Sequence, residues 1–425
     1  MKKIFLCLAL MSLLGLGSQA FAIIGTVDDV PSATLLLPYF EVDLNNAGGQ
    51  NTLFSINNAS ATAVIAHVAV WSDQSVPVLD FDVYLTGYDV QTINMHDILV
   101  NGNLPLTASA GQDPGDHISP KGPASQDINF AQCSGILPYT NPAISASFRL
   151  HLQAALQGKP SPATQKCYGS KHSDGIMRGY VTVDTVNNCN VFFPSDGNQY
   201  LVYLTNQNVL WGDYFYINSD LNLADGETMV GIEACPGALA TCFPLGHTFY
   251  GRYNPGNGPS NMLDRREALP TTMAGRYING GSLFGVTDFI VWREANGAAA
   301  PYTCSNPGPP SWYPLGSTQI AIFDEQEQPV TTQSCPSGDP TCTTTIVIPN
   351  EAQRVNVATD LLAPFPFGWA YLNLQHSGLG PAYADNFAQM WLEVRMEANG
   401  RFSVGMNGIQ LDNANTPVTT IIPIP

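Results

Sequence analysis

The sequence predicts an all-β protein built from two tandem antiparallel β-sandwiches. Short runs rich in Val, Ile, Tyr, Phe and Thr recur along the 425 residues, and Gly, Pro, Asn and Asp bound them, which is typical of strands and turns. Apolar residues make up 44% of the chain, enough for a core, while long helical periodicity is nearly absent. Similar motifs follow one another in the same order in both halves, which favours two domains of one kind.

The first 22 residues read as a secretory signal peptide. Lys2 and Lys3 precede a short apolar run, and the small-x-small pattern Ala20-Phe21-Ala22 follows it as a cleavage site. The apolar run is too short to span a membrane, and no other run approaches the necessary length. We therefore expect a secreted or cell-surface bacterial protein, with the periplasm as a further possibility and no transmembrane segment.

The first sandwich is expected over residues 23–235. Its strands are expected at residues 33–37, 52–56, 64–71, 78–85, 179–184, 200–205 and 213–217. Residues 101–173 differ from this pattern, because they hold every lysine that remains after the signal peptide, several Pro and Gly, and a helical run at 143–157. This stretch is interpreted as a loop-rich insertion.

Residues 236–270 lack strand alternation and are interpreted as a linker, with a short helix at 260–269 that Ser260 would cap. The second sandwich is expected over 271–425. Its strands are expected at residues 287–293, 318–323, 344–348, 353–357, 368–374, 390–397 and 400–407.

The two halves of the sequence contain similar motifs in the same order. Trp71, Asp97 and Gly179 lie in motifs that recur in the same order around Trp292, Asp360 and Gly368. A duplication would make each tryptophan a central-strand core residue, as in immunoglobulin-like sandwiches. The alternative is that strands of any origin use the same few residue types, so the two halves look similar without a duplication.

Eight cysteines remain after the signal peptide, and an even count in an exported chain indicates disulfides. Two pairs share a Cys-Pro-x4-Thr-Cys pattern that closes a short loop. These pairs are Cys235 with Cys242 and Cys335 with Cys342. For the other four, spacing leaves three connectivities open, of which Cys133–Cys167 with Cys189–Cys304 is the one we favour. Zinc is a weaker alternative, because zinc ligands usually lie two to four residues apart.

One aromatic stretch has the composition of a binding site. Aromatic side chains can stack on sugar rings, and a neighbouring carboxylate can bind hydroxyl groups. The candidate ligand-binding residues are Trp211, Asp213, Tyr214 and Tyr216.

Hard oxygen donors follow directly, and calcium takes six to eight such ligands. The candidate calcium ligands are Asn218, Asp220, Asn222, Asp225 and Glu227. The spacing departs from the EF-hand pattern, and a polar turn at Asp225-Gly226 explains the same residues. Calcium is thus a possible cofactor, and no other is indicated.

Composition and motifs exclude several classes. The formal charge is −18, with 34 acidic and 16 basic residues, which argues against nucleic acid as a partner. Gly-x-Ser-x-Gly and His-Glu-x-x-His are both missing from the sequence, so no catalytic residue is assigned. Charged residues make up only 12% of the chain, which leaves a polar, uncharged surface.

The block from Val78 to Val90, VLDFDVYLTGYDV, resembles a segment of a group of exported and cell-surface bacterial proteins. The segments 51–58 and 287–293 are similar to companion segments of that group. The resemblance implies export and a β-rich fold, and it implies no activity. The leading hypothesis is a non-catalytic surface or extracellular protein with a structural, adhesive or assembly role, whose edge strands pair with other surface proteins or with like chains. The alternatives are a carbohydrate-binding or carbohydrate-cleaving protein and a calcium-stabilised module.

Overall fold

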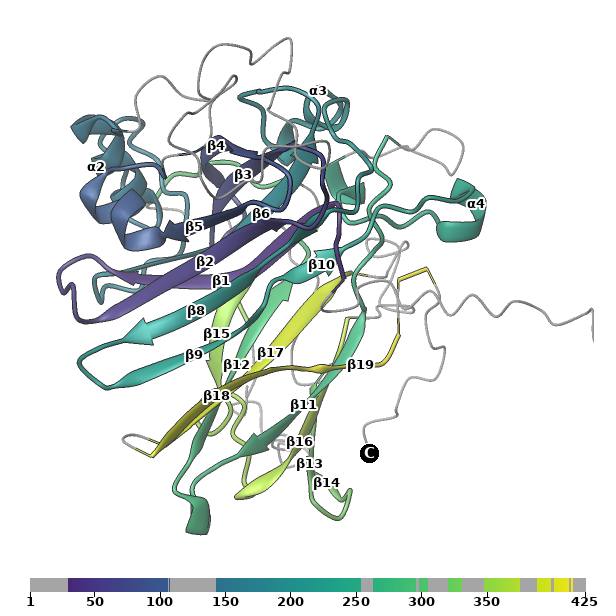
Figure 1. Ribbon diagram of the computed structural model, residues 1–425. Coiled ribbons are helices and arrows are strands. Elements are labelled where there is room, and N and C mark those ends of the chain that lie inside the picture. The colour runs from purple at the N-terminus through teal and green to yellow at the C-terminus, as the bar shows by residue number, and fades with distance from the viewer. Residues whose placement is uncertain are drawn as a thin grey trace, which may run out of the picture.

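The computed structural model describes residues 30–105, 107, 143–253, 263–295, 298–304, 320–330, 348–374, 388–398, 401–412, 414 and 415. The expected signal peptide, Cys133, Cys335 and Cys342 lie outside these residues. Strands dominate the described chain, and its few helices are short (Figure 1). Within the described residues, none of these helices is long and apolar enough to cross a membrane.

The strands before residue 235 form two antiparallel sheets, which we call repeat 1. In order along the chain they are β1 (Thr34–Asp43), β2 (Gln50–Asn58), β3 (Val64–Ser72), β4 (Pro77–Leu85), β5 (Val90–Asn94), β6 (Ile176–Val186), β7 (Leu210–Trp211), β8 (Asp213–Asn218), β9 (Leu223–Thr228) and β10 (Val230–Ile232). One sheet has the order β10-β1-β6-β3-β4, and the other has β5-β2-β8-β9 with β7 beside β2.

The strands after residue 271 form two further antiparallel sheets, which we call repeat 2. They are β11 (Thr272–Ile278), β12 (Val286–Arg293), β13 (Ile320–Asp324), β14 (Pro329–Val330), β15 (Ala352–Asn356), β16 (Phe367–Asn373), β17 (Met390–Ala398), β18 (Phe402–Asn407) and β19 (Ile409–Gln410). Their sheet orders are β14-β13-β16-β11-β19 and β15-β12-β17-β18.

The two repeats have the same topology. We count the strands of each repeat in chain order and leave out β7. In both repeats the first sheet then has the order ninth, first, sixth, third and fourth strand, and the second sheet has the order fifth, second, seventh and eighth. This confirms the all-β tandem-sandwich architecture. The order differs from the A-B-E-D and C-F-G sheets of immunoglobulin domains, so that part of the expectation is not supported.

Side chains repeat as well as strands. The hydroxyl of Thr52 bonds both backbone groups of Glu41, at 3.0 Å each, and the hydroxyl of Thr287 does the same for Ile278, at 2.9 Å each. The β3–β4 and β13–β14 turns each hold a non-glycine residue in the left-handed region, Ser75 at φ 60° and Glu327 at φ 61°. Such detailed agreement supports duplication rather than shared composition.

The residue equivalences inferred from the repeated motifs were only partly right. Gly179 and Gly368 are equivalent, and Asp97 and Asp360 each follow the fifth strand of their repeat. Trp71 lies on a third strand, however, and Trp292 lies on a second strand. The counterpart of Trp71 is Phe323, because Trp71 stacks on Tyr180 in β6 and Phe323 stacks on Trp369 in β16.

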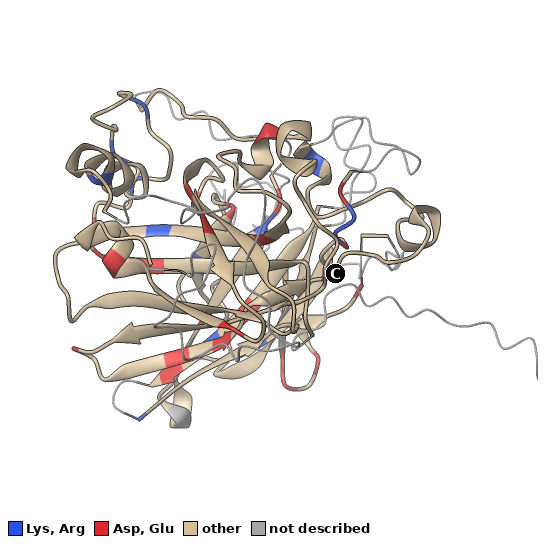
Figure 2. Cartoon of the chain, turned by 45° about the horizontal axis from the view of Figure 1, so that its top comes forward, with Lys and Arg blue, Asp and Glu red and all other residues tan. Residues whose placement is uncertain are grey.

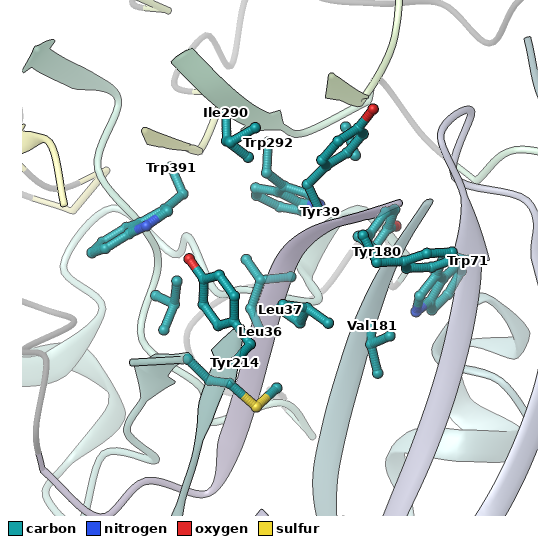
Figure 3. Packing of buried hydrophobic residues seen from close by; sticks show 14 of the residues in the cluster. Leu36, Leu37, Tyr39, Trp71, Tyr180, Val181, Tyr214, Ile290, Trp292 and Trp391 are labelled. Carbon is teal, nitrogen blue, oxygen red and sulfur yellow. The ribbon is translucent and has the colours of Figure 1, made fainter. Parts of the chain in front are cut away.

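Buried side chains of both repeats meet in one continuous cluster. Ile290, Trp292 and Trp391 of repeat 2 lie beside Leu36 and Tyr39 of repeat 1 (Figure 3). Each described strand nevertheless pairs only within its own half. The domain boundaries at 235 and 271 therefore stay a prediction.

The expected linker is packed into the protein. It holds the short helix α4 (Leu239–Cys242) and the turn η3 (Gly251–Tyr253), and Phe249, Tyr250 and Arg266 are buried. A helix at 260–269 was wrong for the described residues from 263 onward, because Arg266 bridges Ala234 in extended conformation. Its side chain then reaches Thr34 across the core at 2.8 Å.

A strand at 200–205 was also wrong. The helical turn α3 (Asn198–Leu201) follows Gly197, whose φ of 60° turns the chain, and the hydroxyl of Tyr200 then donates to buried Asp184 at 2.5 Å. In the expected insertion, helix α2 (Ala146–Ala155) packs against the helical turn η1 (Asp97–Asn101). Its N-terminus is capped by Ser145.

Two disulfides lie within the described residues. The predicted pair Cys235–Cys242 is confirmed. Cys167 pairs with Cys304, so the connectivity we favoured was wrong. Backbone hydrogen bonds join Cys167 and Tyr302 in both directions and bring the two cysteine Cα atoms to 5.1 Å, a contact that spacing in the sequence does not reveal. Cys189 is also disulfide-bonded.

Candidate functional site

Repeat 1 carries an open pocket on the outer face of its second sheet. Residues alternate between the two faces of a strand, so Phe54 and Tyr214 point into the core while Leu53, Ser55, Asp213 and Phe215 point outward. The helical turn η1 and residues 103–105 bound this face on one side. We call the resulting hollow the outer-face pocket.

The outer-face pocket has a volume of about 510 Å³, within the range of small-molecule sites. Its lining combines apolar side chains with hydroxyl, amide and carboxylate groups. The lining residues are Leu53, Phe54, Ser55, Thr92, Ile93, Asn94, Asp97, Ile98, Asn103, Leu104, Pro105, Asp213 and Phe215. These described lining residues include no lysine or arginine, so they offer no charge partner for a phosphate, sulfate or carboxylate ligand.

Hydrogen bonds fix the polar groups of the pocket. Ser55 Oγ donates to Asp213 Oδ1 at 2.7 Å, and Asn51 Nδ2 donates to Asn94 Oδ1 at 3.0 Å. Asn101 Nδ2 donates a hydrogen bond to Asp97 Oδ1 at 2.7 Å. Phe215 has no such restraint on its ring, which is 47% exposed. The pocket thus presents positioned oxygen atoms beside an exposed aromatic surface.

The candidate ligand-binding residues are divided between two faces. Asp213 lines the outer-face pocket. Tyr214 and Tyr216 are buried, and their hydroxyls donate to Glu393 Oε2 at 2.7 Å and to the carbonyl of Tyr39 at 2.9 Å. Trp211 lies on β7, where it pairs with Asn57 of β2, and it does not line the pocket. Strand alternation therefore leaves one of the four at the pocket.

The candidate calcium ligands form the hairpin β8–β9 rather than one loop. Asn218 pairs with Leu223, and Asp220 accepts from Asn46 Nδ2 at 2.8 Å. Asn222 sits in the turn at φ 52°, and Glu227 bonds the amide of Thr228. Asp225 turns away from them to accept from Arg395 of repeat 2 at 2.9 Å. Within the described residues, no three His, Cys, Asp or Glu side chains are placed to hold a metal ion.

The same outer face in repeat 2 is covered by repeat 1. Register and topology make Asp288, Ile290, Glu393 and Arg395 the counterparts of Leu53, Ser55, Asp213 and Phe215. All four are buried. Repeat 2 therefore uses this face for packing, whereas repeat 1 presents the equivalent face as an open pocket.

A charged cleft of about 570 Å³ marks the boundary between the repeats. Arg354 of β15 approaches Glu41 of repeat 1 at 3.4 Å and Glu397 of its own repeat at 3.8 Å, and it also pairs with Asp288. Burial alone would raise the pKa of Glu41, but the guanidinium groups of Arg354 and Arg178 hold that pKa below its usual range. These groups satisfy one another, which favours a structural role. Charged residues are otherwise sparse along the ribbon (Figure 2).

Arg252 of the expected linker fills an aromatic cage between the repeats. Its guanidinium lies 4.6 Å from the ring centre of Tyr253 and 6.0 Å from that of Trp292, and it pairs with Glu351 at 2.6 Å. Cation–π contact and an ion pair together stabilise a buried arginine. The cage is thus occupied by the chain itself and joins linker to both repeats.

Two buried glutamates near the repeat boundary make stability depend on pH. Burial raises the pKa of Glu294 and that of Glu393 to about 7 each. A carboxyl whose folded pKa lies above its unfolded value of about 4.5 stabilises the fold below that value, and this contribution is lost as pH rises through 7. Each contributes up to about 3 kcal/mol. We expect the melting temperature to fall between pH 5 and pH 8, measured by differential scanning calorimetry.

Glu294→Gln and Glu393→Gln should each flatten that pH profile, because a glutamine remains neutral throughout. An unchanged slope in both variants would contradict the assignment. At the acid end Glu41 acts with the opposite sign. Its folded pKa is lowered, so its contribution is lost as pH falls below the ordinary glutamate range.

Sequence reasoning missed Ser55, Asn94, Asp97 and Phe215 as pocket residues. Strand alternation could have identified Ser55 and Phe215. Along β8 it places Phe215 on the same face as Asp213, and along β2 it places Ser55 on one face with Leu53, on the same side of the sheet. Asp97 comes from η1, and only the tertiary fold brings it there. Compared with known proteins, this chain matches no family model, no curated protein and no solved structure.

Proposed function

We propose that the chain is an exported, non-catalytic adhesive protein that binds a neutral carbohydrate in the outer-face pocket. The observation that supports this most is the contrast between the repeats. The outer face buried by intramolecular packing in repeat 2 is open in repeat 1 and hollowed to about 510 Å³. A face that one copy of the fold uses for packing is a suitable face for a ligand in the other.

The chemistry of the pocket supports a sugar as the ligand. A pyranose has apolar C–H faces and a rim of hydroxyls that donate and accept hydrogen bonds. Phe215 and Leu53 provide an apolar surface, while Asp213, Asn94 and Ser55 provide oxygen and nitrogen partners beside it. The two carboxylates, Asp97 and Asp213, disfavour sulfated or carboxylated sugars, because like charges would meet in the pocket.

Location at the bacterial surface or in the extracellular space is part of the proposal. It is supported by the predicted signal peptide and by the disulfides at Cys167–Cys304 and Cys235–Cys242, since disulfides persist in oxidising compartments. A low content of charged residues leaves a polar surface that suits weak, reversible contact with glycans.

The test is a glycan array carrying neutral and acidic sugars, followed by calorimetric titration of each hit with the mature protein. We expect binding to neutral glycans. Phe215→Ala and Asp213→Asn should each weaken the affinity at least tenfold, about 1.4 kcal/mol, through lost stacking and a lost acceptor. The asparagine keeps an oxygen for Ser55, so the pocket should remain folded.

Phe148→Ala is the matched control, because Phe148 is an exposed phenylalanine of α2 that does not line the pocket. It should bind like the unchanged protein. A folded protein that binds no glycan on a broad panel, or that binds equally well without Phe215, would overturn the proposal. Preference for acidic glycans would do the same.

A further inference from the structure

Three phenylalanines are exposed at the end of repeat 2. Phe284 is 66% exposed, Phe367 is 43% exposed and Phe402 is 39% exposed. They come from the β11–β12 connection and from the first residues of β16 and β18. The β11–β12 connection lies at the bottom of the molecule, away from α2 and β5 of repeat 1 (Figure 1). We call this group, with Arg401, the distal tip.

The distal tip is a formed surface and not three scattered side chains. Register places Phe367 beside Ile278, and Gly280 bridges Gly285 across the β11–β12 turn. A Cβ on Gly285 would lie 3.2 Å from the Phe402 ring, so that ring packs directly over the glycine. The guanidinium of Arg401 lies 4.8 Å from the ring centre of Phe284.

Phe284 is held in an unusual backbone conformation. Its φ of 53° lies in the left-handed region, which a bulky side chain rarely adopts. The turn thereby directs an aromatic ring into solvent, where burial would be expected for phenylalanine. Exposed apolar groups gathered in this way are typical of a contact surface.

The counterpart in repeat 1 is polar except for Leu221 of the β8–β9 turn, which is 45% exposed, so the fold does not require an aromatic tip. The β1–β2 connection runs through Asn45, Asn46 and Gly48, and Asn46 bonds Asp220 of the β8–β9 turn at 2.8 Å. The topology places these two connections where Phe284 and Arg401 lie in repeat 2. The exposed phenylalanines are therefore particular to repeat 2.

An acidic turn lies at the same end. Asp324 pairs with Gly368, next to Phe367, and its carboxylate accepts from the amides of Gln326 and Gln328 at 2.8 Å each. Glu325 and Glu327 of this turn are exposed. The distal tip thus has an apolar centre, an arginine on one side and carboxylates near the other strands.

We propose that the distal tips of two copies of this chain pack together about a two-fold axis. A two-fold interface must be self-complementary, and this one offers phenylalanines to phenylalanines and Arg401 to the acidic turn of the other copy. A lipid surface fits less well, because Glu325 and Glu327 would be carried into the interface with the phenylalanines. The dimer would present two outer-face pockets, and so would strengthen binding to a surface that displays many ligands.

The tip is small, so we expect a weak dimer with a Kd on the order of 10 µM. The experiment is sedimentation velocity of the mature protein from about 1 to 200 µM, a range chosen to bracket that Kd. Phe284→Ser should raise the dimer Kd at least tenfold. Phe148→Ala, which removes an exposed phenylalanine elsewhere, should leave it unchanged.

A charge exchange makes the test specific. Arg401→Glu alone should weaken the dimer, and Arg401→Glu combined with Glu325→Arg and Glu327→Arg should restore it. A protein that is monomeric throughout, a dimer insensitive to Phe284→Ser, or no restoration by the exchange would each overturn the proposal. Loss of wild-type binding to phosphatidylcholine vesicles in Phe284→Ser would assign the tip to lipid instead. Calorimetric affinity for a soluble glycan is independent of the dimer, so failure of either proposal is distinguishable.

Discussion

Gly179→Ala and Gly368→Ala will each destabilise the protein severely, by about 4 kcal/mol or to the point of misfolding. A Cβ at Gly179 would overlap the carbonyl oxygen of Trp71, and a Cβ at Gly368 would overlap that of Phe323. These obstacles are backbone atoms of the adjacent strand, which cannot move aside without breaking the sheet. Thermal unfolding followed by circular dichroism at 222 nm measures the effect.

Gly237→Ala is the control for these glycines. The nearest atom to its added Cβ is the sulfur of Cys242 at 3.5 Å, an ordinary contact, so the melting temperature should stay within a few degrees. Because Gly179 and Gly368 occupy one position of a duplicated fold, both variants should fail. A stable Gly368→Ala protein would contradict the equivalence of the two repeats.

Arg354→Met will lower the free energy of unfolding by about 3 kcal/mol. The substitution keeps the apolar stem and removes the charge that Glu41 and Asp288 share. Both carboxylates are almost fully buried, so Asp288 would lose the guanidinium that neutralises it and Glu41 would keep only Arg178, at 3.4 Å. Urea unfolding of the oxidised protein at pH 7 gives the loss, and Arg149→Met on α2 should show almost none.

A double variant separates the charge from the packing. In Arg354→Met combined with Glu41→Gln, the buried Glu41 carboxylate is replaced by a neutral amide, so part of the lost stability should return. If the double variant is less stable than Arg354→Met alone, Arg354 does not stabilise the boundary by pairing with Glu41.

Local pattern was sufficient for most strands. The alternating or continuous apolar runs at β1, β3, β4, β12, β16 and β17 lie where the sequence placed them. Short strands with little apolar content, such as β9, β14 and β19, were missed because neighbouring strands and not their own composition hold them in the sheet. Residues 200–205 looked like a strand because Tyr, Val and Leu favour strands, but buried Asp184 holds the Tyr200 side chain in place.

The candidate site was less accessible to sequence reasoning. Among the candidates named within residues 211–227, only Asp213 faces the outer-face pocket. Exposure of a face depends on what packs against it, and repeat 1 and repeat 2 differ in this respect although their strands agree. No period or spacing along the chain records which of two equivalent faces is covered.

The bond between Cys167 and Cys304 has a consequence for the molecule as a whole. It joins a segment before β6 to a segment after β12, 137 positions apart, and so closes β6 to β12 into a covalent ring that includes the entire passage between the repeats. A backbone nick anywhere inside this ring would leave both halves on one molecule as long as the cystine survives. A protease that cuts the passage would therefore not separate repeat 1 from repeat 2.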